Sequence, residues 1–267
     1  MKKIVVIVLS LVLCLGLMAG CGAAKDEKVI TVAASPTPHA WILQTAAEVL
    51  SEDGWTLEII EYSDYVVPNT IVDEGEIDAN YFQHQPYLDD FNAKNGTKLV
   101  SVAGIHYEPF AIYPGTKVAL EELTAGDKFA VPNDGSNRAR ALLLLEQAGL
   151  ITLAEGVGMG ATILDIVENP IGLQIVEREA AQIAGIRDSV ALAVINGNYA
   201  LQAGLFAGND GIVTEDAANA VAYTNILVVK AGNENSEKTK ALIAALQSAQ
   251  VKDYINSTFP GSVVPMT

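Results

Sequence analysis

The chain has 267 residues and a mass of 28.2 kDa, which is enough for one large domain or two small ones. Half of the residues are hydrophobic and only 18% are charged, a composition that excludes an intrinsically disordered protein. The formal net charge of −16 argues against a surface that binds nucleic-acid phosphates or anionic lipid headgroups. We therefore expect a folded protein that has no nucleic-acid partner.

The N-terminal segment has the features of an export signal. Lys2 and Lys3 precede an uncharged, mostly apolar run at residues 4–20, which lies at the short limit for a membrane-spanning helix. The run ends in Leu-Met-Ala-Gly directly before Cys21, and this ending resembles a bacterial lipobox. The resemblance implies cleavage before Cys21 and lipid attachment to its thiol. The alternative is an ordinary signal peptide followed by a chance cysteine.

These features predict a lipoprotein signal peptide at residues 1–20 and a lipidated tether at residues 21–28. Acyl chains on Cys21 would hold the protein at the extracytoplasmic face of the cell membrane, on the periplasmic or extracellular side. The other cysteine, Cys14, lies within the signal, so the mature globular part contains none. Neither a disulfide framework nor a thiolate metal site is expected there.

From residue 29 onward, short apolar runs alternate with helical patterns. The predicted strands are residues 29–34, 56–62, 77–82, 99–102, 110–113, 129–132, 173–177, 190–195 and 225–229. The predicted helices are residues 40–51, 66–75, 86–95, 139–149, 162–168 and 238–249. Strands separated by helices favour an α/β fold with mainly parallel sheets. Two such lobes would account for the mature chain, lobe I being residues 29–108 plus 222–267 and lobe II residues 109–221.

Two motifs suggest chemistry that their context does not support. The string Gly-Val-Gly-Met-Gly-Ala at residues 156–161 satisfies the dinucleotide fingerprint, but that fingerprint needs a strand directly before it and a helix directly after it. His39, His84 and His106 are separated by 45 and 22 residues, which matches no local metal-ligand spacing. No serine, cysteine or histidine stands in a known catalytic motif either. We therefore expect neither an enzyme nor a cofactor or metal site.

The segment at residues 78–88 concentrates aromatic side chains. Tyr81, Phe82, His84 and Tyr87 lie within seven residues, where a predicted strand leads into a helix. In α/β sheets, ligands bind outside the carboxyl ends of the strands. Rings with a polar tip at such a place can hold the apolar part of a ligand. The alternative for each ring taken singly is an ordinary place in the core.

Several longer motifs together resemble the NlpA/MetQ family of methionine-binding lipoproteins. They are Ala-Ser-Pro-x-Pro-His-Ala at residues 34–40, Asp-Ala-Asn-Tyr-Phe-Gln-His-x-Pro-Tyr-Leu at 78–88, Val-Pro-Asn-Asp-x-Ser-Asn at 131–137, Val-Glu-Asn-Pro at 167–170 and Ala-Val-Ile-Asn-Gly-Asn-Tyr-Ala at 193–200. The motifs occur in the same order as in the family, and the resemblance covers essentially all of the mature chain. It implies a two-lobed periplasmic-binding-protein fold of type II, with the ligand between the lobes. It also implies delivery of methionine to the membrane permease and ATPase subunits of an ABC importer.

The resemblance also implies a set of ligand-binding residues. Arg140 is the expected partner of the ligand's carboxylate, because its planar fork can bond bidentately, and Asn137 lies one helical turn before it. Asn196 and Asn225 are the other positions implied for the amino-acid end. The side-chain pocket corresponds to Tyr65, Phe82, His84 and Tyr87. The sequence leaves open whether the ligand is L-methionine, D-methionine, a methionine-containing dipeptide or another apolar amino acid, and a histidine-based metal-binding importer component is a further alternative.

Overall fold

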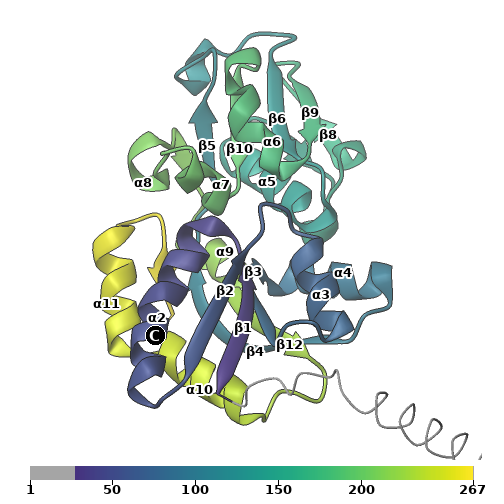
Figure 1. The fold of residues 1–267 in the computed structure, drawn as a ribbon. Coiled ribbons are helices and arrows are strands. Elements are labelled where there is room, and N and C mark those ends of the chain that lie inside the picture. Colours follow the sequence, from purple (N-terminus) through teal and green to yellow (C-terminus); the bar gives the residue numbers. More distant parts are fainter. Residues whose placement is uncertain (1–27, 267) are drawn as a thin grey trace, which may run out of the picture.

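The computed structural model describes residues 28–266, which form two lobes, one above the other in Figure 1. The chain passes from the first lobe into the second and then returns to the first. Each lobe has its own sheet, and the two sheets share no strand. The predicted signal peptide, Cys21 and almost all of the tether lie outside the described residues. Within residues 28–266, no helix is both long and apolar enough to cross a membrane.

The first lobe is built on a six-stranded sheet in the order β13-β4-β12-β3-β1-β2. Its strands are β1 (Val29–Ala34), β2 (Thr56–Glu61), β3 (Ala79–His84), β4 (Leu99–Tyr107), β12 (Asn225–Lys230) and β13 (Val264–Pro265). β1 pairs in parallel with β2 and β3, whereas β12 runs antiparallel between β3 and β4. The chain therefore leaves this lobe after β4 and returns to the middle of its sheet with β12.

Helices cover both faces of the first sheet. Ile30, Val32 and Leu227 pack toward α2 (Trp41–Glu52), α10 (Glu237–Leu246) and α11 (Ala249–Thr258). Ala33 and Phe82 point to the other face, toward α3 (Val67–Glu74) and α4 (Gln85–Asn95). Because neighbouring residues of a strand point to opposite faces, a strand buried on both sides reads as a continuous apolar run.

The second lobe is built on a five-stranded sheet in the order β11-β5-β10-β6-β9. Its strands are β5 (Ala111–Pro114), β6 (Lys128–Pro132), β9 (Gln174–Arg178), β10 (Leu192–Ile195) and β11 (Val213–Thr214). β6 pairs in parallel with β9 and β10, and β5 is antiparallel to β10. One face packs against α5 (Gly135–Gln147), and the other against α6 (Ala180–Ile183) and α7 (Gly197–Gln202). The α8 helix (Ala207–Asp210) and α9 (Ala217–Ala220) follow before the return to β12.

The two-lobed α/β fold is confirmed, but one predicted helix is wrong. Residues 162–168 begin with a capping box between Thr162 and Asp165, which starts a single helical turn, Ile163–Asp165. The chain then extends as β8 (Ile166–Glu168), which pairs with β7 (Thr152–Leu153) in a separate two-stranded sheet. The β-branched residues of β8 suit a strand. The glycine string before it leads into the short turn Gly158–Gly160 and not into an α-helix, so the dinucleotide context is missing.

Candidate functional site

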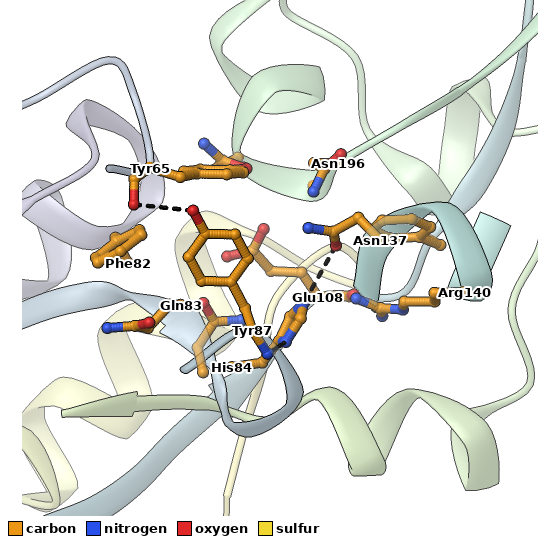
Figure 2. Close-up of a pocket in the computed structure, with 13 residues that line it drawn as sticks. Tyr65, Phe82, Gln83, His84, Tyr87, Glu108, Asn137, Arg140 and Asn196 are labelled. Atoms are coloured by element: carbon orange, nitrogen blue, oxygen red, sulfur yellow. Dashed lines mark hydrogen bonds between the residues drawn. The ribbon is translucent and has the colours of Figure 1, made fainter. Parts of the chain in front are cut away.

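A cavity lies between the two lobes, and all eight side chains predicted to bind the ligand line it (Figure 2). They come from the β3–α4 corner and the loop before α3 in one lobe, and from α5, the start of α7 and the start of β12 on the other sides. The complete lining is Tyr65, Phe82, Gln83, His84, Tyr87, Glu108, Phe110, Asn137, Arg140, Asn196, Gly197, Asn198 and Asn225. The structure therefore brings the predicted residues together, and their contact with a ligand stays a prediction.

Four of these side chains, Tyr65, Phe82, His84 and Tyr87, form what we call the aromatic wall. The Tyr65 ring lies 5.7 Å from Phe82 and 5.7 Å from Tyr87, measured between ring centroids. The Tyr87 hydroxyl donates to the Tyr65 carbonyl oxygen at 3.0 Å. Burial raises the pKa of both tyrosines, so their hydroxyls remain protonated. From the second lobe, the Tyr199 ring packs against Tyr65 at a tilt, with the ring centroids 5.1 Å apart.

His84 ends β3 and caps α4, which fixes its tautomer. Its Nδ1 accepts a hydrogen bond from the backbone N–H of Tyr87 at 3.2 Å, so the proton of the neutral ring is on Nε2. Nε2 then donates to Asn137 Oδ1, 3.1 Å away across the cavity. Burial, and next the positive charge of Arg140, lower the pKa of His84 to about 3. The histidine is therefore a neutral donor at physiological pH.

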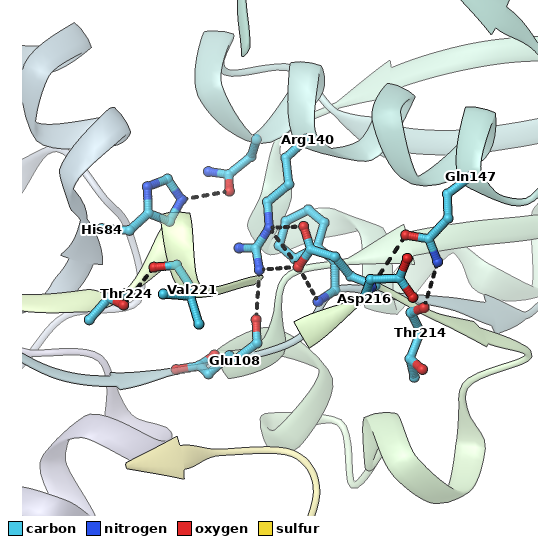
Figure 3. Close-up of polar contacts among 11 residues, drawn as sticks. His84, Glu108, Arg140, Gln147, Thr214, Asp216, Val221 and Thr224 are labelled. Carbon is cyan, nitrogen blue, oxygen red and sulfur yellow. Dashed lines mark hydrogen bonds and ion pairs between the residues drawn. The ribbon is translucent and has the colours of Figure 1, made fainter. Parts of the chain in front are cut away.

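Arg140 lies one turn after Asn137 on α5, but its bidentate partner is a protein carboxylate that the sequence analysis missed. Its Nε and Nη2 donate to Glu215 at 3.0 and 2.6 Å, and Nη2 also donates to the Glu108 carbonyl oxygen at 2.8 Å (Figure 3). The guanidinium lies over the rings of Phe110 and Tyr223, with ring centroids 4.0 and 4.2 Å from Cζ. Nη1, the third nitrogen of the guanidinium, has no hydrogen-bond acceptor within the described part of the chain and is left for another acceptor.

Glu108 is the second residue that sequence reasoning missed. It is 5% exposed, directly follows β4, and lines the cavity. His106 Nε2 donates to its Oε1 at 2.8 Å, and His39 Nε2 lies 3.5 Å from the same oxygen. A Cβ on Gly197 would come within 2.3 Å of its Oε2, so only glycine fits there. Burial raises the pKa of this carboxyl group. The sequence does set this residue apart, because Glu108 is the one acidic residue between Asp90 and Glu121.

The three histidines do not form a common metal site. His39 and His106 gather around Glu108 with their nearest ligand atoms within 4.8 Å of one another, whereas His84 stands apart in the aromatic wall. His39 Nε2 also lies 2.9 Å from Asn225 Oδ1, and His106 Nδ1 is hydrogen-bonded to the Tyr81 hydroxyl. Burial lowers the pKa of His39 to about 4 and that of His106 to about 3. The pair is thus neutral and hydrogen-bonded to protein groups.

Two asparagines carry buried polar atoms that have no partner within the described part of the chain. They are Asn196 Oδ1, at the start of α7, and Asn198 Nδ2, in its first turn. The Asn198 oxygen accepts from the Tyr65 hydroxyl at 2.5 Å. One orphan is an acceptor and the other a donor, and an unpaired buried polar group costs about 1–3 kcal/mol. Both line the cavity, so the arrangement suits a ligand that both donates and accepts hydrogen bonds.

The sequence profile of the NlpA lipoprotein family matches residues 30–267. The chain belongs to the NlpA lipoprotein family. The D-methionine-binding lipoprotein MetQ of Salmonella typhimurium is 43% identical over 92% of this chain and 92% of that protein. A putative lipoprotein from Ruminococcus gnavus has a solved structure with a TM-score of 0.89, at 53% identity, covering 90% of this chain and all of that one.

A third similar protein is a nutrient-binding protein from Burkholderia cenocepacia, whose structure was solved bound to methionine. It is 41% identical, with a TM-score of 0.85 over 89% of this chain and all of that one. NlpA lipoproteins are substrate-binding components of transport and are not enzymes. Membership of this family confirms the resemblance that the sequence motifs carried.

Proposed function

We propose that this NlpA lipoprotein captures methionine outside the cytoplasm and delivers it to an ABC importer, while a lipid on Cys21 anchors it to the membrane. The observation that carries the proposal is a cavity with two kinds of lining. One side is the aromatic wall, and the other presents a buried carboxylate, an arginine and unpaired amide atoms. The names of the Salmonella and Burkholderia relatives support methionine as the ligand.

The polar side has partners for both charges of a free amino acid. Glu108 is a buried carboxylate held in place by His106, and it offers its cavity side to the ligand's ammonium. The unpaired Asn196 Oδ1 is a second acceptor for the same group. Arg140 Nη1 and the unpaired Asn198 Nδ2 are donors for the ligand's carboxylate. Each charge must be satisfied once the cleft closes, because a buried unpaired charge costs several kcal/mol.

The aromatic wall is the partner for the methionine side chain. A thioether is polarizable and flexible, and it contacts ring edges and faces with a gain of about 0.3–1.5 kcal/mol per contact. Tyr65, Phe82 and Tyr87 present such edges and faces without a charge. A glutamate side chain would bury a second negative charge against them, and an alanine side chain would leave the space unfilled.

The lobes are closed tightly around the site, so binding requires movement. The cavity is about 30 Å³ in volume. Two cross-cleft hydrogen bonds, His84 to Asn137 and Tyr65 to Asn198, span this space. We propose that the lobes part to admit methionine and that the ligand's polar groups replace these bonds when they close again.

Calorimetric titration of refolded, ligand-stripped protein tests the ligand. L-methionine, D-methionine, a methionine-containing dipeptide, alanine and glutamate form the panel. We expect a form of methionine to bind best, and glutamate at the top would overturn the proposal. Glu108→Gln should weaken methionine binding at least about 30-fold, because the ammonium loses its charged partner. The matched control, Glu177→Gln, changes a half-exposed acid outside the cavity and should leave affinity unchanged.

Cell fractionation tests the anchor. Cys21→Ser should abolish acylation and release the mature protein into the soluble fraction, without a change in methionine affinity. Cys14→Ser is the matched control, since that cysteine lies in the segment that cleavage removes. A Cys21→Ser protein that still sediments with membranes through a high-salt wash would contradict lipidation at this residue. Methionine uptake by cells should fall with the same variant if delivery to an importer needs the anchor.

A further inference from the structure

The arginine expected to bind the ligand's carboxylate is already paired with a carboxylate of the protein. Glu215 is buried, and its oxygens accept from Arg140 Nε at 3.0 and 3.2 Å and from Nη2 at 2.6 Å. Their side chains are 3% and 5% exposed. A bidentate pair of this kind is among the strongest charge-assisted contacts, and removing water from it strengthens the attraction. The positive charge that a ligand meets is therefore largely offset.

Glu215 stands behind Arg140 and does not touch the cavity. It is absent from the cavity lining, and it lies on the segment through which the chain returns to the first lobe. Its Oε2 also accepts from the backbone N–H of Phe110, on the outgoing segment, at 3.3 Å. Next to it, Gln147 donates to the Thr214 carbonyl and accepts from the Asp216 N–H (Figure 3). Glu215 is thus fixed by both crossing segments and cannot swing away from the arginine without moving them.

The charge inventory of the closed site follows from these contacts. Glu215 and Glu108 are the acids beside Arg140, and the three histidines are neutral, with pKa values of about 3 to 4. A bound zwitterion adds one ammonium, which Glu108 can pair, and one carboxylate, for which the donors are Nη1 of a neutralised arginine and the uncharged Asn198 Nδ2. Like charges brought together in a dry site cost several kcal/mol. The carboxylate of the ligand is thus the weaker of its two charged anchors.

We propose that Glu215 competes with the ligand's carboxylate for Arg140 and so determines how strictly the site requires that carboxylate. This inference rests on the proposed function and specifies its substrate class. The ligand must carry a free, protonated amino group, whereas its carboxyl group can be neutral, as in an amide or at a peptide bond. Glu215 acts through Arg140 and is a specificity-determining residue that does not touch the ligand.

The test compares L-methionine with L-methionine amide, which differ in charge at one end. Titrations at about pH 6 keep the α-amino group of both ligands protonated and the buried histidines neutral. For the wild-type protein, the dissociation constant of the amide should exceed that of methionine by less than about 100-fold. A larger ratio of these two constants would overturn the inference. In Glu215→Gln, the positive charge of Arg140 is no longer offset by a protein carboxylate, so it attracts the carboxylate of methionine more strongly. The ratio of the two dissociation constants, amide to methionine, should therefore rise about 10-fold. A ratio that stays the same or falls would overturn the inference.

Gln147→Ala provides the matched control. It removes the two hydrogen bonds that hold residues 214–216 against α5 but leaves the charge beside Arg140 unchanged. It should keep the wild-type ratio. An equal rise in both variants would mean that crossing-segment geometry, and not charge, sets the selectivity. If Glu215→Gln does not fold, the wild-type ratio alone decides. Failure of methionine itself to bind the wild-type protein would instead overturn the proposed function.

Discussion

The two sides of the cavity are built in different ways. The aromatic wall comes from one short stretch of chain, residues 65–87, in one lobe, and its rings contact each other directly. The charged side is assembled from the outgoing crossing segment, α5, the start of α7 and β12. Arg140 is held there by a residue distant in the sequence, Glu215, 75 residues away, and Glu108 by its near neighbour His106.

The shape of the ligand and its charges are therefore recognised by different parts of the cavity. The wall can change one ring at a time, because its neighbours are other uncharged rings that keep most of their contacts. The charged side cannot, because removing one member leaves a buried partner without a counter-charge. We therefore expect substitutions on the charged side to act on folding as well as binding, and those in the wall to act mainly on ligand choice.

The largest expected effect is on pH stability, and it compares the two sides directly. His84 belongs to the wall, whereas His39 and His106 back the charged side, and burial lowers all three pKa values to about 3 or 4. Their folded pKa lies below the unfolded value, so the unfolded chain binds protons first as the pH falls. Stability is complete above about pH 6.5 and should fall by about 2 kcal/mol for each histidine by about pH 5.

Urea unfolding at these two pH values measures the loss. The raised pKa of Glu108 acts in the opposite direction and offsets part of it, because its folded form takes up a proton more readily than the unfolded chain. In His84→Asn the loss should be smaller by about 2 kcal/mol, since one neutral buried histidine is gone. A protein that is more stable at the lower pH would contradict neutral, buried histidines.

The next effect distinguishes two arginines on the same helix. Arg140→Ala should destabilise the protein by about 3–5 kcal/mol, because Glu215 stays buried without its partner. Arg138, two residues earlier, pairs with Glu177 at 3.3 Å, and the two side chains are 24% and 29% exposed. Arg138→Ala should cost under about 1 kcal/mol. Chemical denaturation measures both, and equal losses would mean that the Arg140–Glu215 pair gains nothing from its burial.

The sequence predicted the parts of the fold that depend on local pattern. Apolar runs marked most strands of both sheets, because strands covered on both faces are apolar throughout. The two-residue edge strands β11 and β13 were not predicted, since they are too short to form such a run. Boundaries were less exact where polar residues carry out a local task. Helix α5 begins at Gly135, four residues before its predicted start, since Asp134 caps it by accepting from Asn137 N–H at 3.0 Å. β4 continues to Tyr107, beyond its apolar part.

The site was predictable only in part, for the same reason. Residues gathered in one motif, such as Phe82, His84 and Tyr87, could be recognised together. Glu108 and Glu215 each stand in an unremarkable local context, and only folding reveals that one meets two histidines and the other an arginine. Long-range pairing between single residues leaves no periodicity for a sequence pattern to show.

The smallest effect concerns the chemistry of the wall itself. Norleucine has the shape of methionine but a methylene in place of sulfur, so both ligands engage the charged side equally. Sulfur–ring contacts add about 0.3–1.5 kcal/mol, and methionine should therefore bind up to about 10-fold more tightly than norleucine. Leucine should follow, because its branch meets the rings. Phe82→Leu removes one ring while keeping the position apolar, and it should narrow the gap between methionine and norleucine without altering the dependence on Glu108. Calorimetric titration of both ligands to both proteins measures this gap. Norleucine binding as tightly as methionine would mean that the wall selects for length alone, and that its aromatic character has no part in ligand choice.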